Sequence, residues 1–142
     1  MVEQSVLIIA TLSLVIEFVV LGLLTLGYFW KRMKNYRRHG IAMTTALVLH
    51  LVTIFSWMIW SFIAFFTAGS VDYTNLLVIV TLVHVVLGIS AASLGVWLVA
   101  SWHMQTDVQK CFPRKRIMLT TIILWVTAIA LGIVLYVAVF LS

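Results

Sequence analysis

The chain has 142 residues, of which 64% are hydrophobic and 9% are charged, and its formal net charge is +5. A water-soluble fold of this length could not bury so much apolar surface, so the composition excludes a soluble domain and indicates an integral membrane protein. The basic residues only border the apolar runs, which argues against a folded nucleic-acid-binding surface. We therefore expect the lipid bilayer as a partner, and no nucleic acid.

Four apolar runs are each longer than the roughly 20 residues that are needed to cross a bilayer. They cover about residues 5–30, 41–66, 76–102 and 117–141. Because the connections between them are short, consecutive helices must run antiparallel. The sequence thus predicts an all-α fold with one domain, residues 1–142, which is an integral membrane up-down four-helix bundle.

The positive charges predict how this bundle is oriented. All nine Lys and Arg residues lie in two connections, between the first and second runs and between the third and fourth. The remaining connection, residues 67–75, contains Asp72 and no basic residue. By the positive-inside rule, the basic connections are cytoplasmic and both termini are outside. We expect a multi-pass protein of the cell (plasma) membrane.

Five ionisable side chains lie in or beside the apolar runs, and they are the candidate functional residues: Glu17, His39, His50, His84 and His103. An ionisable group in hydrocarbon is costly, so such groups usually face the protein interior and bind a metal, a cofactor or protons. The structural alternatives are headgroup or capping roles for His39 and His103, and hydrogen bonds between helices for the other three.

Helical spacing indicates which of these residues share a face. His39 and His50 are eleven residues apart, close to three turns, so both lie on one stripe of the second run. That stripe also contains Met43, Ala46, Thr53, Trp57 and Ser61, and we expect it to face inward. On the third run, small residues follow His84 on its own face: Gly88, Ala91, Ala92 and Gly95. This pattern permits close helix packing, or leaves a flat slot for a macrocycle.

The expected depth in the membrane restricts which residues can meet. Counting ~1.5 Å per residue from the cytoplasmic ends places His50 about 14 Å deep, Glu17 about 20 Å and His84 about 27 Å. His50 and Glu17 are then close enough in height for a hydrogen bond or a proton-transfer pair. His50 and His84 would make a poor bis-histidine pair for one haem.

Two further ligand combinations follow from the same count. His39 and His103 are level near the interface, so they could pair on the cytoplasmic side. Met58 lies at the depth of His84, and a methionine thioether can bind haem iron or copper.

Three segments resemble a known family: LGYFWKRMKNYRRHGIAM (residues 26–43), LVHVVLGISAASL (residues 82–94) and WVTAIALGIVLY (residues 125–136). They are similar to segments of the small membrane proteins called the domain-of-unknown-function 420 family. Members often accompany haem-copper oxidase and copper-assembly proteins, so the resemblance implies haem or metal binding. The family often has histidine where this chain has Ser61 and Arg114, so only His39 and His84 carry over.

Three functions follow from these observations. The first is a haem- or copper-binding subunit or accessory protein of a respiratory-type membrane oxidoreductase complex. Haem b or copper would be bound by some of the four histidines and Met58, with His84, His50 and Glu17 as the candidate metal ligands and His84 the first choice. The second is a cofactor-free assembly factor or structural subunit of a larger membrane enzyme, and the third is a small proton or solute transporter that uses Glu17 and His50. We do not expect a stand-alone enzyme.

Overall fold

The computed structural model of the chain describes residues 4–103 and 115–141, without the side chains of residues 102 and 103. The elements are α1 (Gln4–Arg32), α2 (Tyr36–Thr53), η1 (Ile54–Met58), α3 (Ile59–Thr67), α4 (Leu76–His103), α5 (Lys115–Tyr136) and η4 (Val137–Leu141). The two η segments are π-helical and continue the helices before them. They complete four spans that are long and apolar enough to cross a membrane, which confirms the four predicted helices: Gln4–Arg32, Tyr36–Thr67, Leu76–Ser101 and Lys115–Leu141.

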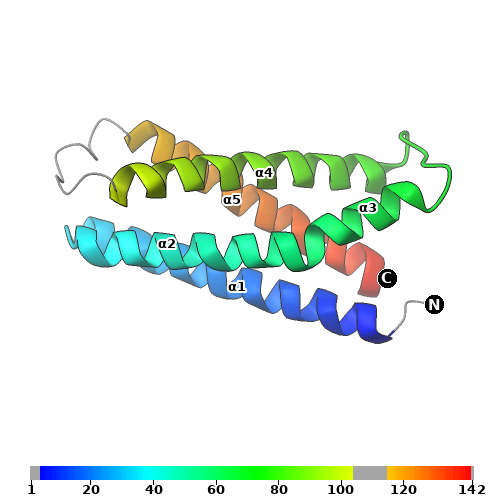
Figure 1. The fold of residues 1–142 in the computed structure, drawn as a ribbon, viewed down its shortest axis with the longest axis horizontal. Coiled ribbons are helices and arrows are strands. Elements are labelled where there is room, and N and C mark those ends of the chain that lie inside the picture. The colour runs from blue at the N-terminus through cyan, green and yellow to red at the C-terminus, as the bar shows by residue number, and fades with distance from the viewer. Residues whose placement is uncertain (1–3, 104–114, 142) are drawn as a thin grey trace.

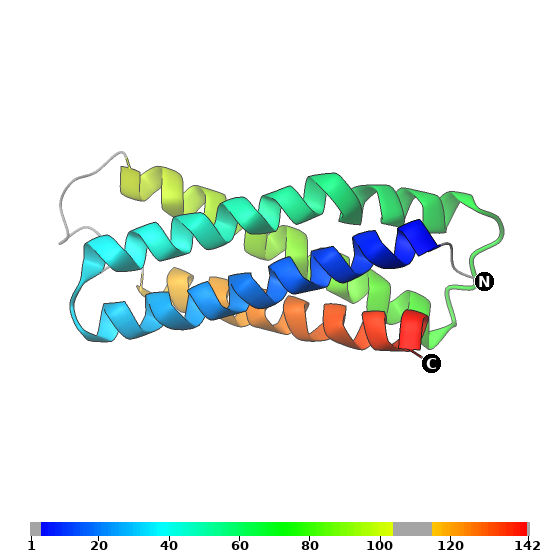
Figure 2. The same ribbon diagram turned by 90° about the horizontal axis from the view of Figure 1, so that it is seen from below.

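The four spans form an up-down bundle made of two helical pairs (Figure 1). Helix α1 packs mainly on α2 and α4 mainly on α5, while α2 also contacts α4 and α1 also contacts α5. The view from below shows the start of α1 and the end of η4 at the same end of the bundle as the connection between α3 and α4 (Figure 2). The seven Lys and Arg residues of the described part lie at the opposite end. We call this the basic end.

The turn from α1 to α2 at the basic end is fixed by backbone hydrogen bonds. The amide of Asn35 donates to the Trp30 carbonyl (2.9 Å) and the amide of Lys34 to the Lys31 carbonyl (3.0 Å). Lys34 has a φ of 61°, so it adopts the left-handed conformation that ends a helix in a Schellman motif. Asn35 then caps α2 by accepting a hydrogen bond from the Arg38 amide (3.3 Å). The chain therefore reverses its direction within three residues, which brings α1 and α2 into contact.

Close approach of the helices depends on small residues on their inner faces. A Cβ on Gly27 of α1 would lie 2.7 Å from the Met43 Cε of α2, and a Cβ on Gly95 of α4 would lie 3.0 Å from Leu47 Cδ1. The Leu47 side chain thus occupies the space beside Gly95 that could otherwise accept a flat ring. At this position the small-residue face of α4 serves helix packing. The larger buried residues of the core surround these contacts: Val20, Leu24, Leu47, Trp125 and Ile129.

The inward stripe of α2 is most buried at its centre. Ala46, His50 and Thr53 are all buried, whereas Met43 before them and Trp57 and Ser61 after them are half-buried. In η1 the chain makes wider turns than in an α-helix, but Trp57 and Ser61 are still less exposed than their neighbours Phe55 and Trp60. A carbonyl in this segment, that of Phe55, accepts a hydrogen bond from the Trp60 indole (3.0 Å). Helix α3 consequently leaves the direction of α2 (Figure 1).

The connection between α3 and α4 carries a negative charge opposite the basic end. Asp72 Oδ1 accepts hydrogen bonds from the Thr74 hydroxyl (2.6 Å) and the Thr74 amide (3.0 Å). These hydrogen bonds stabilise the ionised carboxylate, the side-chain bond most, and they lower the pKa of Asp72 below its ordinary value. Asp72 is therefore ionised at neutral pH, and the two ends of the bundle differ in charge.

Candidate functional site

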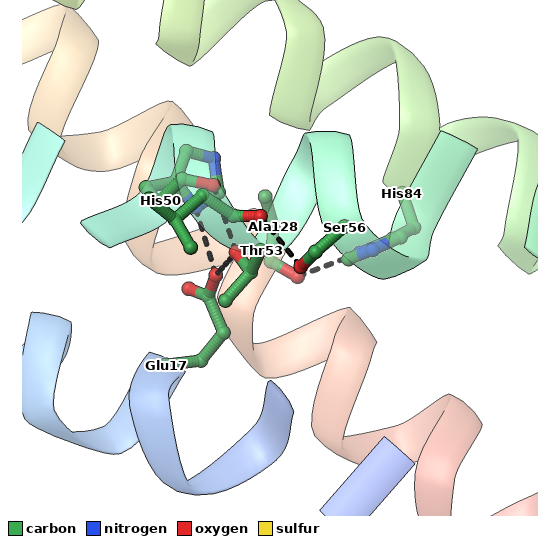
Figure 3. A network of polar contacts seen from close by, with 7 residues as sticks. Glu17, His50, Thr53, Ser56, His84 and Ala128 are labelled. Atoms are coloured by element: carbon green, nitrogen blue, oxygen red, sulfur yellow. Dashed lines mark hydrogen bonds and ion pairs between the residues drawn. The ribbon is translucent and has the colours of Figure 1, made fainter. Parts of the chain in front are cut away.

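The most polar site of the described core joins α1 to α2 in the middle of the bundle. His50 Nδ1 lies 2.9 Å from Glu17 Oε1, and the two side chains are only 4% and 7% exposed. This contact confirms the expectation that the two residues are close enough in height to hydrogen-bond. It also confirms that both point into the bundle. Figure 3 shows the two side chains meeting between their helices.

Thr53 completes the site from the turn of α2 that follows His50. Its hydroxyl lies 2.7 Å from Glu17 Oε1 and 2.8 Å from the His50 carbonyl oxygen. A hydroxyl has one proton, so Thr53 donates to one of these two acceptors at a time. Because Thr53 is 1% exposed, water cannot replace this bond from outside. Thr53 therefore fixes the orientation of the Glu17 carboxyl group.

Three buried polar atoms at this site have no hydrogen-bond partner in the described part of the chain: Glu17 Oε2, His50 Nε2 and Trp125 Nε1. The Trp125 ring of α5 packs on the imidazole of His50, with 5.1 Å between ring centroids and a 51° tilt. Buried polar groups are normally satisfied, and an exception indicates an ordered water or a chemical role. The pair is thus hydrogen-bonded on one side and retains one unpaired polar atom on each residue.

His84 lies in a second polar contact, on α4. Its Nδ1 is 2.8 Å from the Ala128 carbonyl oxygen of α5, and its ring lies against Gly132, where a Cβ would be 3.1 Å from His84 Cε1. Ala128 follows Trp125 by three residues, so a single turn of α5 contacts both His50 and His84. Figure 3 shows His84 beside Ala128. The prediction that His84 faces the bundle interior is confirmed.

His39 makes the same kind of contact at the basic end. Its Nδ1 lies 2.8 Å from the Gly27 carbonyl oxygen of α1. A carbonyl can only accept, so His39 and His84 both donate from Nδ1, and in the neutral imidazole Nε2 then has the lone pair. His50 has the same tautomer when its partner Glu17 is ionised. A metal-binding histidine is commonly held through one nitrogen in this way, but so is a histidine that only joins two helices.

The described residues do not form a ready site for the expected cofactors. No group of three or more His, Cys, Asp or Glu side chains that could hold a metal ion occurs among them. A haem does not fit the bundle as it is packed. Leu47 fills the space beside Gly95, and the ring of His84 fills the space beside Gly132. The largely apolar cavity between α2, α4 and α5 has a volume of about 90 Å³, whereas pockets for cofactor-sized ligands have roughly 300–1,000 Å³.

No hydrogen bond or ring contact joins Met58 to the Glu17–His50 pair in the described part of the chain. Met58 is the last residue of η1 and is half-buried. The side chain of His103 lies outside the described residues, so its expected pairing with His39 stays a prediction. Two residues of the site are not among the predicted site residues: Thr53 was predicted only to lie on the inward stripe, and Trp125 occurs only in the segment of residues 125–136. The spacing of Thr53, three residues after His50 on the same face, could have indicated its role.

The sequence matches no family model, and neither a curated protein nor a solved structure matches it. The resemblance to the domain-of-unknown-function 420 family therefore stays a prediction.

The position of Thr53 predicts a specific loss of stability. Thr53→Val keeps the shape of the side chain and removes the hydroxyl, so Glu17 loses one hydrogen bond in a buried site. We expect the free energy of unfolding in detergent to fall by about 1–2 kcal/mol. Thr45→Val is the matched control, because the exposed Thr45 hydroxyl bonds only the Ile41 carbonyl of its own helix (2.8 Å). Equal stability of the two variants would show that the Thr53 hydroxyl does not support the site.

Proposed function

We propose that this chain is a proton-binding membrane protein in which the buried Glu17–His50 pair takes up and releases a proton. The observation that carries the proposal is the arrangement of the pair. Its two residues share one hydrogen bond of 2.9 Å, and each has a second polar atom that is buried and unpaired in the described structure. The unpaired His50 Nε2 is a position at which a proton can be added.

The geometry allows a proton to be added without breaking the contact. With Glu17 ionised and His50 neutral, the pair has a net charge of −1 and Nδ1 donates to Oε1. A further proton can bind at His50 Nε2, and this leaves the Nδ1–Oε1 hydrogen bond in place. The pair then has no net charge, which a low-dielectric interior tolerates better than an uncompensated carboxylate. Loading and release of a proton therefore need no movement of the helices.

Polar groups lie on both sides of the pair along the bundle. His39 is eleven residues before His50 on α2, about 16 Å closer to the basic end. His84 lies against the turn of α5 that follows Trp125, and nearer the opposite end the Thr11 hydroxyl contacts the Tyr136 hydroxyl (2.7 Å). Groups of this kind, joined by water, form proton pathways in membrane proteins.

We further infer that the basic end faces the cytoplasm and that both termini are outside, in the plasma membrane. The charge difference between the basic end and the Asp72 connection supports this orientation. The connections described here are short, and the helix faces outside the core are broadly apolar. The resemblance to the domain-of-unknown-function 420 family favours the further proposal that the chain acts as a subunit or accessory protein of a larger membrane oxidoreductase.

Nitrogen NMR of ¹⁵N-histidine-labelled protein in nanodiscs tests the proton-binding proposal. In the unaltered chain, we expect the His50 signals to change over a range of pH as the pair takes up and releases its proton. In Glu17→Gln, His50 should stay neutral throughout this range, because an imidazolium would be buried without a compensating charge. His50→Asn assigns the signals.

Asp72→Asn is the control for this titration, since it removes a carboxylate at the end of the bundle and leaves the buried pair intact. Its His50 signals should follow those of the unaltered protein. The proposal is overturned if His50 keeps one protonation state across the range in the unaltered protein, or if it titrates identically in Glu17→Gln.

A second candidate, haem or copper binding, is supported by one observation. The Ala128 carbonyl holds His84 Nδ1, which leaves Nε2 as the nitrogen that would bind a metal. A haem would require the helices around Gly95 and Gly132 to separate. Of the residues with a free Nε2, only His84 combines depth in the membrane with the expected family motif.

The visible absorption spectrum and metal content of the purified protein test this second candidate. If a cofactor is bound, His84→Ala should lower the haem or metal per chain, while the circular dichroism of the helices is unchanged. Thr81→Ala, one turn earlier on α4, is the control for a change on the same helix, because its hydroxyl bonds only the Leu77 carbonyl (2.8 Å). A colourless, metal-free protein would contradict this second candidate, and proton binding would be the one proposal left. Full occupancy in His84→Ala would show that His84 is not a ligand.

A further inference from the structure

The cavity between α2, α4 and α5 lies at the basic end of the bundle, apart from the Glu17–His50 pair. It has a volume of about 90 Å³, and residues from all three helices line it, among them His39, Thr44, Val99, Met118 and Trp125. The Thr44 hydroxyl donates to the Gly40 carbonyl of its own helix (2.8 Å), and Thr121, also in the lining, donates to Ile117 (2.7 Å). With both hydroxyls turned to their own backbones, the wall of the cavity is almost entirely apolar.

Size and polarity decide which class of ligand suits this cavity. An apolar cavity of about 150 Å³ accepts a benzene ring, so a space of about 90 Å³ is narrow for a ring system. A slender hydrocarbon chain needs less width, and the apolar wall offers it contact along its length. The cavity is therefore suited to a few methylene groups of an acyl chain.

Positive charge is present at the same end on two of the helices that line the cavity. Arg37 follows Tyr36, a lining residue, and Lys115 comes one helical turn before Met118. Both side chains are exposed. The two carboxylates in the described ranges are elsewhere, because Glu17 bonds His50 and Asp72 is at the opposite end. Neither Arg37 nor Lys115 forms an ion pair with these two carboxylates.

We propose that this cavity and the adjacent basic residues bind one anionic phospholipid. One acyl chain occupies the cavity between α2, α4 and α5, and the phosphate headgroup is held by Arg37 and Lys115. Basic sites between transmembrane helices are suited to anionic headgroups, and an acyl chain supplies apolar surface that the cavity wall can contact. The proposal does not depend on the proton-binding function.

Native mass spectrometry of the full chain tests the acyl-chain part of this proposal. The protein is released from micelles that contain either phosphatidylglycerol or phosphatidylcholine with identical chains, and the lipids retained per protein are counted. We expect the unaltered chain to retain one phosphatidylglycerol. Val99→Phe fills the cavity from α4 and should reduce this retention by about tenfold. Val96→Phe adds the same ring at a position of α4 that is exposed and outside the cavity, and it should have no effect.

Thr44→Leu fills the cavity from α2 and gives the same test if Val99→Phe does not fold. The proposed acyl-chain site is wrong if folded Val99→Phe or Thr44→Leu retains phosphatidylglycerol as the unaltered chain does.

Two double variants, each of which removes two positive charges, test the headgroup part of the proposal. Arg37→Gln with Lys115→Gln should remove the preference for phosphatidylglycerol over phosphatidylcholine. Arg32→Gln with Lys34→Gln removes the same charge from exposed positions at the same end and should keep the preference. Equal retention of the two lipids by the unaltered chain would overturn the anionic site, and equal losses in both double variants would show only a general attraction to the basic end.

Discussion

The structure of this chain depends on one constraint, which is that an ionisable side chain within a lipid bilayer needs a partner inside the protein. Glu17 is the one carboxylate within the described spans, and His50 and Thr53 of α2 both hydrogen-bond it. These contacts require α1 and α2 to lie close together, and Gly27 and Ala42 permit that approach nearer the basic end. Trp125 closes the site from α5. The pair thus links the first helical pair and gives the second pair a surface to pack on.

Counting residues along each span was sufficient to predict the main contact of the site. The length of the apolar runs predicts the four spans, and a rise of ~1.5 Å per residue predicts that Glu17 and His50 are at similar heights. Heights do not depend on how the helices are rotated about their axes. The contact between Glu17 and His50 was therefore predictable even though the sequence alone does not define which helices are neighbours around the bundle.

The packing of the helices against one another was less predictable, because the contacts of each residue depend on side chains from other helices. Gly95 is compatible with a flat ligand or with close packing, and only the position of Leu47 on α2 decides for packing. The hydrophobic pattern does not indicate the π-helical η1, and Trp57 and Ser61 are half-buried there and in α3. Trp125 resembles an interfacial anchor in sequence. Its contact with His50 arises from the packing of α5.

The central claim is that Glu17 and His50 act as one coupled unit, and a double-mutant cycle measures that coupling directly. The free energies of unfolding in detergent are compared for the unaltered chain, Glu17→Ala, His50→Ala and the double variant. We predict a coupling energy of about 1–3 kcal/mol, because each single change leaves the other group buried without its partner. If the stability losses of the two single variants add up to that of the double variant within about 0.5 kcal/mol, the two residues act independently, and this account is contradicted.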